Sequence, residues 1–211
     1  MLLFWWVVAG ALAVLDWYAV AAARPRLESA AKPATMVALV GAAVALGAPD
    51  AGAGRWLLAA LVLGLVGDVL LLGDSEPRFL GGLGAFLVGH LGYLVAFVVL
   101  GLDRPVWALV GAAAVALALG PASRVLTATA REGGLALAGP VAAYVVVLGA
   151  MVVAAWATGQ VLAGLGATVF LASDTTLALN RFVAPRRWAP VLVMVTYHLG
   201  QALIVLGVLR S

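Results

Sequence analysis

Two aspartates placed inside apolar runs are the residues of this sequence best suited to carry out chemistry. Asp68 interrupts the apolar stretch 65–72, and Asp174 stands in the similar stretch 171–178. A carboxyl group inside the hydrocarbon of a membrane is costly, so such residues usually face the interior of a helical bundle and serve a function. We therefore take Asp68 and Asp174 as the candidate catalytic residues.

The two stretches belong to a longer internal repeat. Asp68 and Asp174 are 106 residues apart, and the two histidines of the chain, His90 and His198, are 108 residues apart. Two prolines that each open an apolar run share this offset, at 107 residues. Three such similar offsets, each about half the chain, indicate a tandem duplication whose paired acids meet at one site.

The composition is that of a membrane protein. The 211 residues are 65% hydrophobic and 10% charged, with a mean hydropathy of +1.16, whereas soluble chains are about 25% charged. Apolar runs of about 16 to 22 residues are typical of membrane-spanning helices, and no segment alternates as a membrane β-strand does. The absence of cysteine excludes disulfides, thiolate nucleophiles and cysteine-ligated metals.

We predict an all-α, polytopic membrane protein of eight transmembrane helices, forming a single membrane domain over residues 1–211. The predicted spans are 2–23, 33–48, 56–73, 79–101, 105–121, 135–157, 159–179 and 189–209. The boundary after residue 157 is the weakest, because only Thr158-Gly159-Gln160 marks it, and without that turn the count falls to seven. The first span lacks a basic N-terminal region and contains Asp16, so we expect a retained helix rather than a signal peptide.

The basic residues predict the orientation. With eight spans, nine lysine and arginine residues fall on one side and three on the other. This positive-inside asymmetry places the larger set in the cytoplasm and both termini on the non-cytoplasmic side of the cell (inner) membrane. Four helices in each half make a 4+4 parallel internal repeat, with halves of about 1–104 and 105–211.

The candidate acids lie close to the cytoplasmic surface. Asp68 precedes the boundary residue Asp74 by six positions, and Asp174 precedes Asn180 by the same number, which is about 9 Å of helix. Lys32 opens the second span at that surface. Two carboxyl groups brought together by the repeat cannot both ionise easily, so one would keep its proton. One member of such a pair can donate a proton while the other, ionised member stabilises positive charge.

Aromatic and amide side chains lie at helical spacing near these acids. His90 and Tyr93 share one stripe of the fourth span, and Tyr197 and Gln201 are four residues apart on the eighth. The histidines fit hydrogen-bonded packing as well as a site, and two histidines without cysteine cannot make a three-histidine zinc site. A metal site of two histidines and two aspartates stays open but has no spacing signature here, so we expect no metal and no other cofactor.

An ordered set of motifs extends from about residue 32 to 204: Lys32-Pro33, Gly67-Asp68, Phe86 through His90 to Tyr93, Ser173-Asp174 leading to Phe182, and Tyr197 through Gln201 to Ile204. This set resembles the YhhN-like lysoplasmalogenases, integral membrane hydrolases of eight predicted spans. The resemblance implies hydrolysis of the vinyl ether bond of lysoplasmalogen to a fatty aldehyde and a glycerophospho-ethanolamine or -choline. It also implies that Asp68 and Asp174 occupy the essential acidic positions of the family.

On this hypothesis Asp68 and Asp174 act as general acid and base, in an order that a nearly symmetric repeat does not decide. Lys32 would bind the phosphate of the substrate. The other candidate substrate-binding residues are His90, Tyr93, Tyr144, Ser173, Tyr197 and Gln201. The expected partners are the lysophospholipid substrate and membrane lipid, with no nucleic acid, and the sequence leaves a homo-oligomer open.

Three other functions remain open at this point. A different lysolipid-type hydrolase could use the same acids. A proton-coupled carrier of a lipid or solute would also have intramembrane acids, histidines and a twofold repeat. A structural membrane scaffold would tolerate the loss of both acids. Separate assays for fatty aldehyde and fatty acid would distinguish the hydrolases.

Overall fold

The computed structural model describes residues 1–73 and 75–210, and this part of the chain is helical, with no strand. Its helices are α1 (Leu2–Ala21), α2 (Pro25–Ala45), η1 (Ala48–Asp50), α3 (Gly52–Leu71), α4 (Glu76–Leu100), η2 (Pro105–Trp107), α5 (Ala108–Ala157), α6 (Val161–Phe182) and α7 (Ala189–Leu209). Over these residues, seven α-helices are long and apolar enough to cross a membrane. The prediction of an all-α, multi-pass membrane protein is therefore confirmed. Asp74, the expected boundary of one span, lies outside the described residues, as does Ser211.

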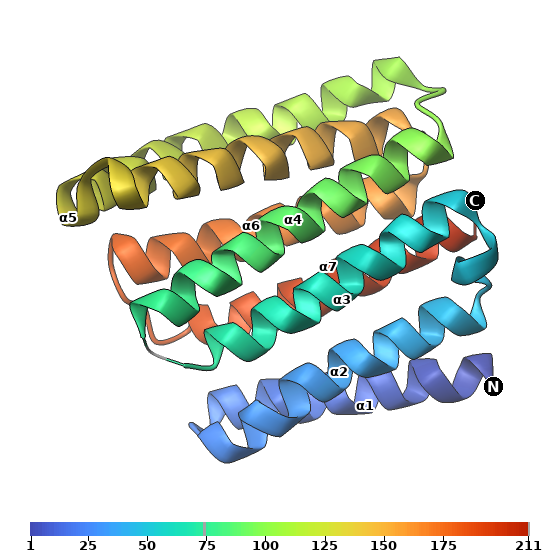
Figure 1. Cartoon of the computed structure of the whole chain (residues 1–211), viewed down its shortest axis with the longest axis horizontal. Helices are drawn as coiled ribbons and strands as arrows, with labels where there is room; N and C mark the ends of the chain where they lie inside the picture. The colour runs from blue at the N-terminus through green and yellow to red at the C-terminus, as the bar shows by residue number, and fades with distance from the viewer. Residues whose placement is uncertain (74, 211) are drawn as a thin grey trace.

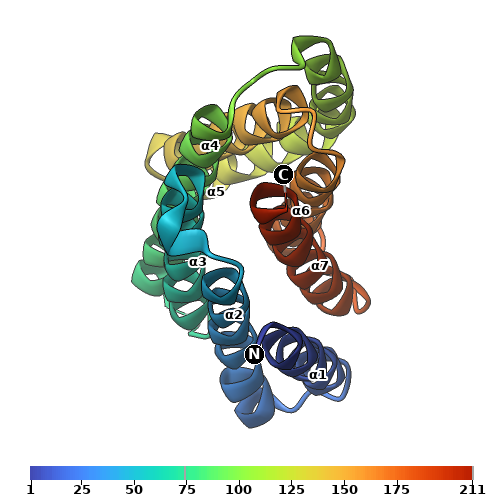
Figure 2. The same ribbon diagram turned by 90° about the vertical axis from the view of Figure 1, so that its right-hand side faces the viewer.

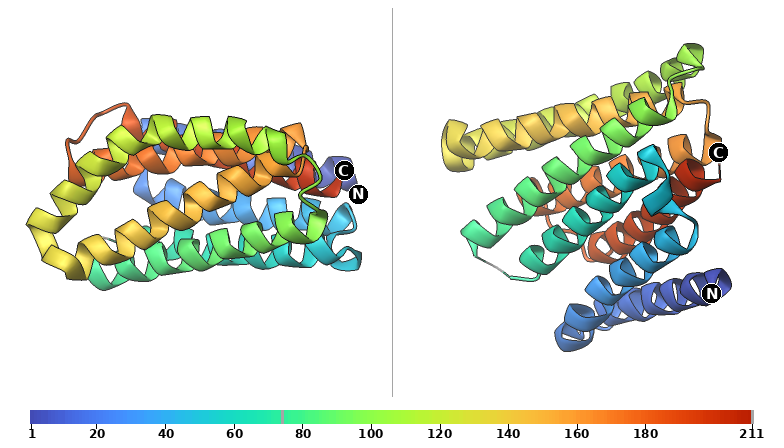
Figure 3. Two further views of the ribbon diagram at one scale, coloured as in Figure 1. Left: turned by 90° about the horizontal axis from the view of Figure 1, so that it is seen from above. Right: turned by 45° about the vertical axis from the view of Figure 1, so that its right-hand side comes forward.

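The longest helix, α5, reverses direction near its middle. Gly134 has φ 59° and ψ −151°, a conformation that glycine adopts readily and other residues do not. The first arm, 108–133, runs to this bend, and the second arm, 135–157, runs back toward the same end of the molecule (Figure 3). The arms are in close contact, since a Cβ added at Gly111 would lie 2.8 Å from the Cα of Val153.

The bend of α5 replaces a loop that the sequence predicted. We expected spans 105–121 and 135–157 to be joined by an irregular segment, but the helix continues through residues 122–133. Seven of its twelve residues are alanine, arginine, leucine or glutamate, which favour helix strongly enough to extend it beyond the apolar run. The arginine and glutamate before Gly134 therefore lie on the helix rather than in a loop.

The turn between α5 and α6 lies where the sequence predicted it. The first helix ends at Ala157 and the next begins at Val161, and Gly159 between them has a left-handed φ of 77°. The hydroxyl of Thr158 donates to the carbonyl oxygen of Ala155 at 2.6 Å. These local bonds satisfy polar groups at the helix end, where the backbone leaves the regular pattern.

Viewed nearly along their axes, the helices form two facing walls (Figure 2). One wall consists of α2, α3 and α4 and the other of α6 and α7, with α1 and α5 at the two edges. α3 packs mainly on α4, and α6 packs mainly on α7. The start of α1 and the end of α7 lie at one end of the bundle, opposite the bend of α5 (Figure 1).

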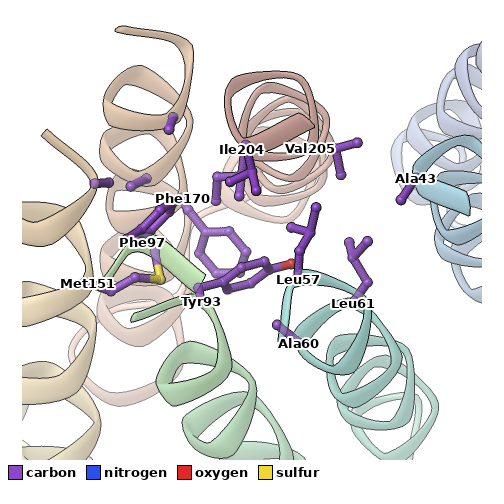
Figure 4. Packing of buried hydrophobic residues seen from close by; sticks show 14 of the residues in the cluster. Ala43, Leu57, Ala60, Leu61, Tyr93, Phe97, Met151, Phe170, Ile204 and Val205 are labelled. Atoms are coloured by element: carbon purple, nitrogen blue, oxygen red, sulfur yellow. The ribbon is translucent and has the colours of Figure 1, made fainter. Parts of the chain in front are cut away.

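A buried core of large side chains joins the two walls (Figure 4). Tyr93 and Phe97 of α4 lie beside Phe170 of α6 and Ile204 of α7, and Met151 enters from the second arm of α5. All five side chains are almost completely removed from the surface. This core fixes the relative positions of the helices that carry the repeated motifs.

Small residues allow α6 and α7 to approach each other closely. A Cβ added at Gly166 would lie 2.7 Å from the backbone nitrogen of Ile204, and one added at Gly207 would lie 2.2 Å from that of Ala163. Lipid is as apolar as the helices, so close van der Waals packing is a main source of association between them.

Replacing Gly207 with alanine is expected to destabilise the protein by about 1 to 3 kcal/mol, because the new methyl group meets helix backbone rather than a movable side chain. Thermal unfolding of the purified protein in detergent measures the change. Gly139→Ala is the matched control, since a Cβ there meets nothing within 4 Å. Equal unfolding temperatures for the two variants would contradict this packing.

Candidate active site

A cavity is lined by both walls of the bundle and by both arms of α5. Its interior has room for water-sized spheres over about 110 Å³, and most of its lining is apolar. The polar or charged residues among its lining are Lys32, Asp68, Tyr144, Ser173, Asp174, Thr175 and Tyr197. A large apolar chamber with a few convergent polar groups is the usual form of a small-molecule site.

Asp68 is held in a buried ion pair. It lies in the last turn of α3, and only 1% of its surface is exposed. The Nζ of Lys32 lies 3.2 Å from its Oδ1, and the hydroxyl of Tyr197 donates to its Oδ2 at 2.7 Å. Each carboxylate oxygen thus has a partner, which compensates the cost of removing the charge from water. The contacts join α2, α3 and α7 at one point.

Lys32 lies deeper in the molecule than the sequence prediction placed it. We expected a span that begins at residue 33, but α2 begins at Pro25, so Lys32 is seven residues along the helix, or about 10 Å from its start. Proline suits the first turn of a helix, and Pro25 takes that position while Pro33 lies inside the helix. The ammonium group is therefore engaged by Asp68 inside the bundle rather than free.

Asp174 lines the same cavity from α6, in the opposite wall. The hydroxyl of Tyr144, on the second arm of α5, donates a hydrogen bond to its Oδ2. Within residues 1–73 and 75–210, no cation forms a salt bridge with Asp174. The two acids are therefore in different environments, because Asp68 faces an ammonium group and Asp174 faces a neutral phenol.

The other predicted site residues that line the cavity form hydrogen bonds that connect the helices. Ser173, next to Asp174, donates from its Oγ to the carbonyl oxygen of Val193 at 2.9 Å and so ties α6 to α7. Tyr144 and Tyr197 line the cavity with their hydroxyl groups bonded to the two acids. These tyrosines fix the positions of both carboxyl groups.

Three predicted site residues lie behind the cavity rather than in its lining. Tyr93 donates a hydrogen bond to Oε1 of Gln201. His90 is buried, and its ring packs edge to face on Phe170 and Tyr144, with centroid distances of 4.9 and 5.1 Å. The structure therefore places His90, Tyr93 and Gln201 as supports of the cavity wall, without direct access to its interior.

Sequence reasoning missed most of the apolar lining. The two arms of α5 contribute, among others, Leu119 and Val125 from the first arm and Val141 and Leu148 from the second. Apolar residues at these spacings occur in every membrane-spanning helix, so they carry no mark of a site. Tyr144 was the one polar residue on α5 that indicated its participation.

A second polar cluster lies where α1 packs on α7, outside the cavity. Trp17 donates from its Nε1 to Nδ1 of His198 at 3.1 Å. Asp16 is fully buried, and its carboxylate oxygens have no hydrogen-bond partner among the residues of known position. Neither Asp16 nor His198 lines the cavity. Over the described ranges, no group of three or more histidine, aspartate or glutamate side chains is arranged to hold a metal ion.

Removing the ammonium group of Lys32 is expected to destabilise the protein. Lys32→Met should cost about 3 to 5 kcal/mol, because Asp68 would be left as an unpaired buried charge. The double variant Lys32→Met with Asp68→Asn should recover much of this loss, since it removes the charge as well. Thermal unfolding in detergent measures both. A Lys32→Met protein as stable as the wild type would contradict the importance of the ion pair.

The fold and the cavity together define a polytopic membrane protein with two carboxyl groups in a large, mainly apolar chamber. The chain belongs to the YhhN family, whose model matches residues 27–208. The family predicted from the ordered motifs is thereby confirmed. No solved structure gives a significant match.

Several curated relatives are named lysoplasmalogenases. Lysoplasmalogenase TMEM86B of Homo sapiens is 37% identical over 163 residues, which cover 77% of this chain and 67% of the relative. Lysoplasmalogenase TMEM86A of Bos taurus is 31% identical, with 72% and 64% covered. The lysoplasmalogenase of Mycobacterium tuberculosis is 33% identical over 187 residues, with 86% and 70% covered. The chain thus spans about two thirds of the length of these relatives.

Proposed function

We propose that this protein is a membrane-bound lysoplasmalogenase, which hydrolyses the vinyl ether bond of lysoplasmalogen to a fatty aldehyde and a glycerophospho-ethanolamine or -choline. Its relatives carry that name. The observation that carries the proposal is that Asp68 and Asp174, one from each repeated motif, line a single cavity. The apolar walls of this cavity suit the alkenyl chain of such a substrate.

Asp174 is the proton donor of the proposed mechanism. Its carboxyl group accepts a hydrogen bond from the neutral Tyr144 and has no cation bound to it in the described structure. In its acid form it gives a proton to the β-carbon of the vinyl ether. The carbon–carbon π bond breaks as the new C–H bond forms, which leaves an oxocarbenium ion.

Asp68 is the base of the proposed mechanism. Lys32 and Tyr197 each contact one of its oxygens, contacts that favour the carboxylate form, and a fixed negative charge would stabilise the oxocarbenium ion. Water attacks the ion and transfers a proton to Asp68, forming a hemiacetal. The hemiacetal then passes its hydroxyl proton to Asp174 while Asp68 protonates the glycerol oxygen. The C–O bond breaks, both products leave, and both acids return to their starting forms.

Replacing either acid with asparagine is expected to stop this reaction. Asp174→Asn cannot donate the proton and Asp68→Asn cannot accept one, so aldehyde release should fall about 10²- to 10⁴-fold in each. The assay uses lysoplasmalogen and an ester lysolipid as substrates and measures fatty aldehyde and fatty acid separately, with helical content checked by circular dichroism.

Asp50→Asn is the control for loss of a carboxylate, because Asp50 lies in η1, away from the cavity. Substantial turnover by either purified cavity variant would refute the two-acid mechanism. Release of fatty acid from the ester lipid alone would favour a different lysolipid hydrolase. Movement of uncleaved lipid driven by a pH gradient would favour a carrier.

We also propose that the chain crosses the membrane eight times, with each arm of α5 as a separate span. Each arm is longer than the roughly 20 residues needed to cross the hydrocarbon. The bend at Gly134 then lies on the same side as the other basic connections, which include Arg24, Arg78 and Arg186. The positive-inside rule makes that side cytoplasmic and places both termini outside the inner cell membrane.

The 4+4 parallel repeat is supported by one contact between equivalent positions. Tyr93 and Gln201 are 108 residues apart, the same offset as His90 and His198, and they hydrogen-bond to each other. Residues related by a twofold axis meet in this way when they lie close to that axis. In this arrangement α1–α4, within residues 1–104, correspond to the two arms of α5 with α6 and α7, within 105–211.

Cysteine labelling is expected to place the bend of α5 on the cytoplasmic side. The chain has no cysteine, so Glu132→Cys, Arg187→Cys and Asp103→Cys each introduce a single thiol. In intact cells an impermeant maleimide should label Asp103→Cys alone, and in inverted vesicles it should label the other two. A result that places positions 132 and 187 on opposite sides would contradict the eight-span topology.

A further inference from the structure

A second hollow lies at the end of the bundle where α5 bends. It is formed by one face of α5 between residues 123 and 132 and by the end of α6, and it holds about 1060 Å³ of open space. The bend of α5 projects beyond the neighbouring helices at this end (Figure 3). Charged and hydroxyl side chains make up much of the lining of the hollow, beside Ala128, Phe182 and Val183, whereas the catalytic cavity is lined almost entirely by apolar surface.

Two unpaired guanidinium groups belong to this hollow. Arg124 and Arg131 are seven residues apart, which places them on the same face of α5. Both are exposed, and neither forms a salt bridge with any residue that the structure describes. Glu132 lines the same hollow and is also exposed and unpaired. The hollow therefore presents two positive charges and one negative charge to a ligand.

The hollow adjoins the catalytic cavity. Phe182 lines both spaces, and Ala122 and Val125, which line the cavity, flank the hollow residue Arg124. Along α6, Phe182 follows Asp174 by eight residues, or about 12 Å. A ligand that reaches the two acids from this side has its polar end beside Arg124.

Among the residues that the structure describes, the lining of the catalytic cavity offers no free cation for a phosphate. Lys32 is the cationic side chain among its lining residues, and its ammonium group is bound to Asp68. Arg181, which does not line the cavity, lies over the ring of the lining residue Phe79 with its Cζ 3.7 Å from the centroid. In a lysophospholipid only the glycerol backbone separates the ether oxygen from the phosphate. The phosphate therefore needs a cationic group from just beyond this lining.

We propose that this hollow is the head-group site, in which Arg124 and Arg131 bind the phosphate and Glu132 faces the amine. Guanidinium groups bind phosphate oxygens through pairs of charge-assisted hydrogen bonds, which makes arginine well suited to this role. A carboxylate beside two arginines matches a zwitterion better than a simple anion. This inference rests on the proposed lysophospholipid substrate, and it assigns to α5 the phosphate contact that we expected from Lys32.

Binding of ether lipids that cannot be hydrolysed tests the site without turnover. The ligands are a saturated 1-O-alkyl glycerophosphoethanolamine and the matching 1-O-alkylglycerol, measured in uncharged detergent. Arg124→Gln with Arg131→Gln should weaken binding of the phospholipid by about tenfold or more, because hydrogen bonds to charged groups are lost. Binding of the alkylglycerol, which has no phosphate, should stay unchanged.

The matched control is Arg24→Gln with Arg26→Gln, which removes two charges at the same end of the bundle but near α1 and α2. These substitutions should leave both affinities unchanged. Unchanged phospholipid binding in the Arg124 and Arg131 variant, or equal weakening with the alkylglycerol, would overturn the proposal. If both double variants lost the same affinity for the phospholipid, and lost it only in nanodiscs of anionic lipid, the arginines would be attracting bulk lipid. That result would also overturn the proposal.

Glu132→Gln tests the amine contact separately. It should remove any preference for the phosphoethanolamine ligand over the corresponding 1-O-alkyl glycerol phosphate, while retaining affinity for the phosphate. A preference that survives the substitution would refute the role of Glu132. These binding results do not depend on turnover, so they test the head-group site alone. Absence of aldehyde release by the wild type would instead count against the proposed reaction.

Discussion

Lys32 and Asp68 meet inside the helical bundle, where either charge alone would be too costly to keep. Their ion pair fixes α2 against α3, and the hydrogen bond from Tyr197 adds α7 to the same point. The position of Asp174 depends on this arrangement, since its helix α6 packs on α7 and the neighbouring Ser173 donates a hydrogen bond to the carbonyl oxygen of Val193 in α7. The ion pair between Lys32 and Asp68 thus helps to position α6 and α7 opposite α2 and α3, and with them the cavity between the two walls.

The same pair makes the two candidate acids chemically different. Tyr93 and Gln201, which are 108 residues apart, meet through a hydrogen bond, yet within residues 1–73 and 75–210 Asp68 has a salt-bridged cation and Asp174 has none. The second acid has a phenol instead. The proposed acid–base mechanism needs two carboxyl groups in different states, and in that mechanism the single lysine beside Asp68 is what distinguishes the two roles.

The sequence was enough to predict the helical membrane fold, the family and the participation of both acids in one cavity. Membrane helices have a strong composition signature, and a carboxylate stands out within it. The depth of Lys32 was missed because helix propensity extended α2 back to Pro25. The lining from α5 was missed because leucine and valine look alike whether they face lipid or a cavity. The sequence could not show that residues such as His90 lie behind the cavity wall, because their positions depend on packing between helices distant in the chain.

Lys32 is the only lysine of the chain, and it lines the cavity into which the proposed reaction would release an aldehyde. An unprotonated amine in that place would condense with the product to an imine and block the site. The nitrogen of Lys32 is instead paired with Asp68 at 3.2 Å, so it is not free to approach the aldehyde. Together with the absence of thiols, this arrangement leaves no free nucleophile of either kind for an electrophilic product to modify.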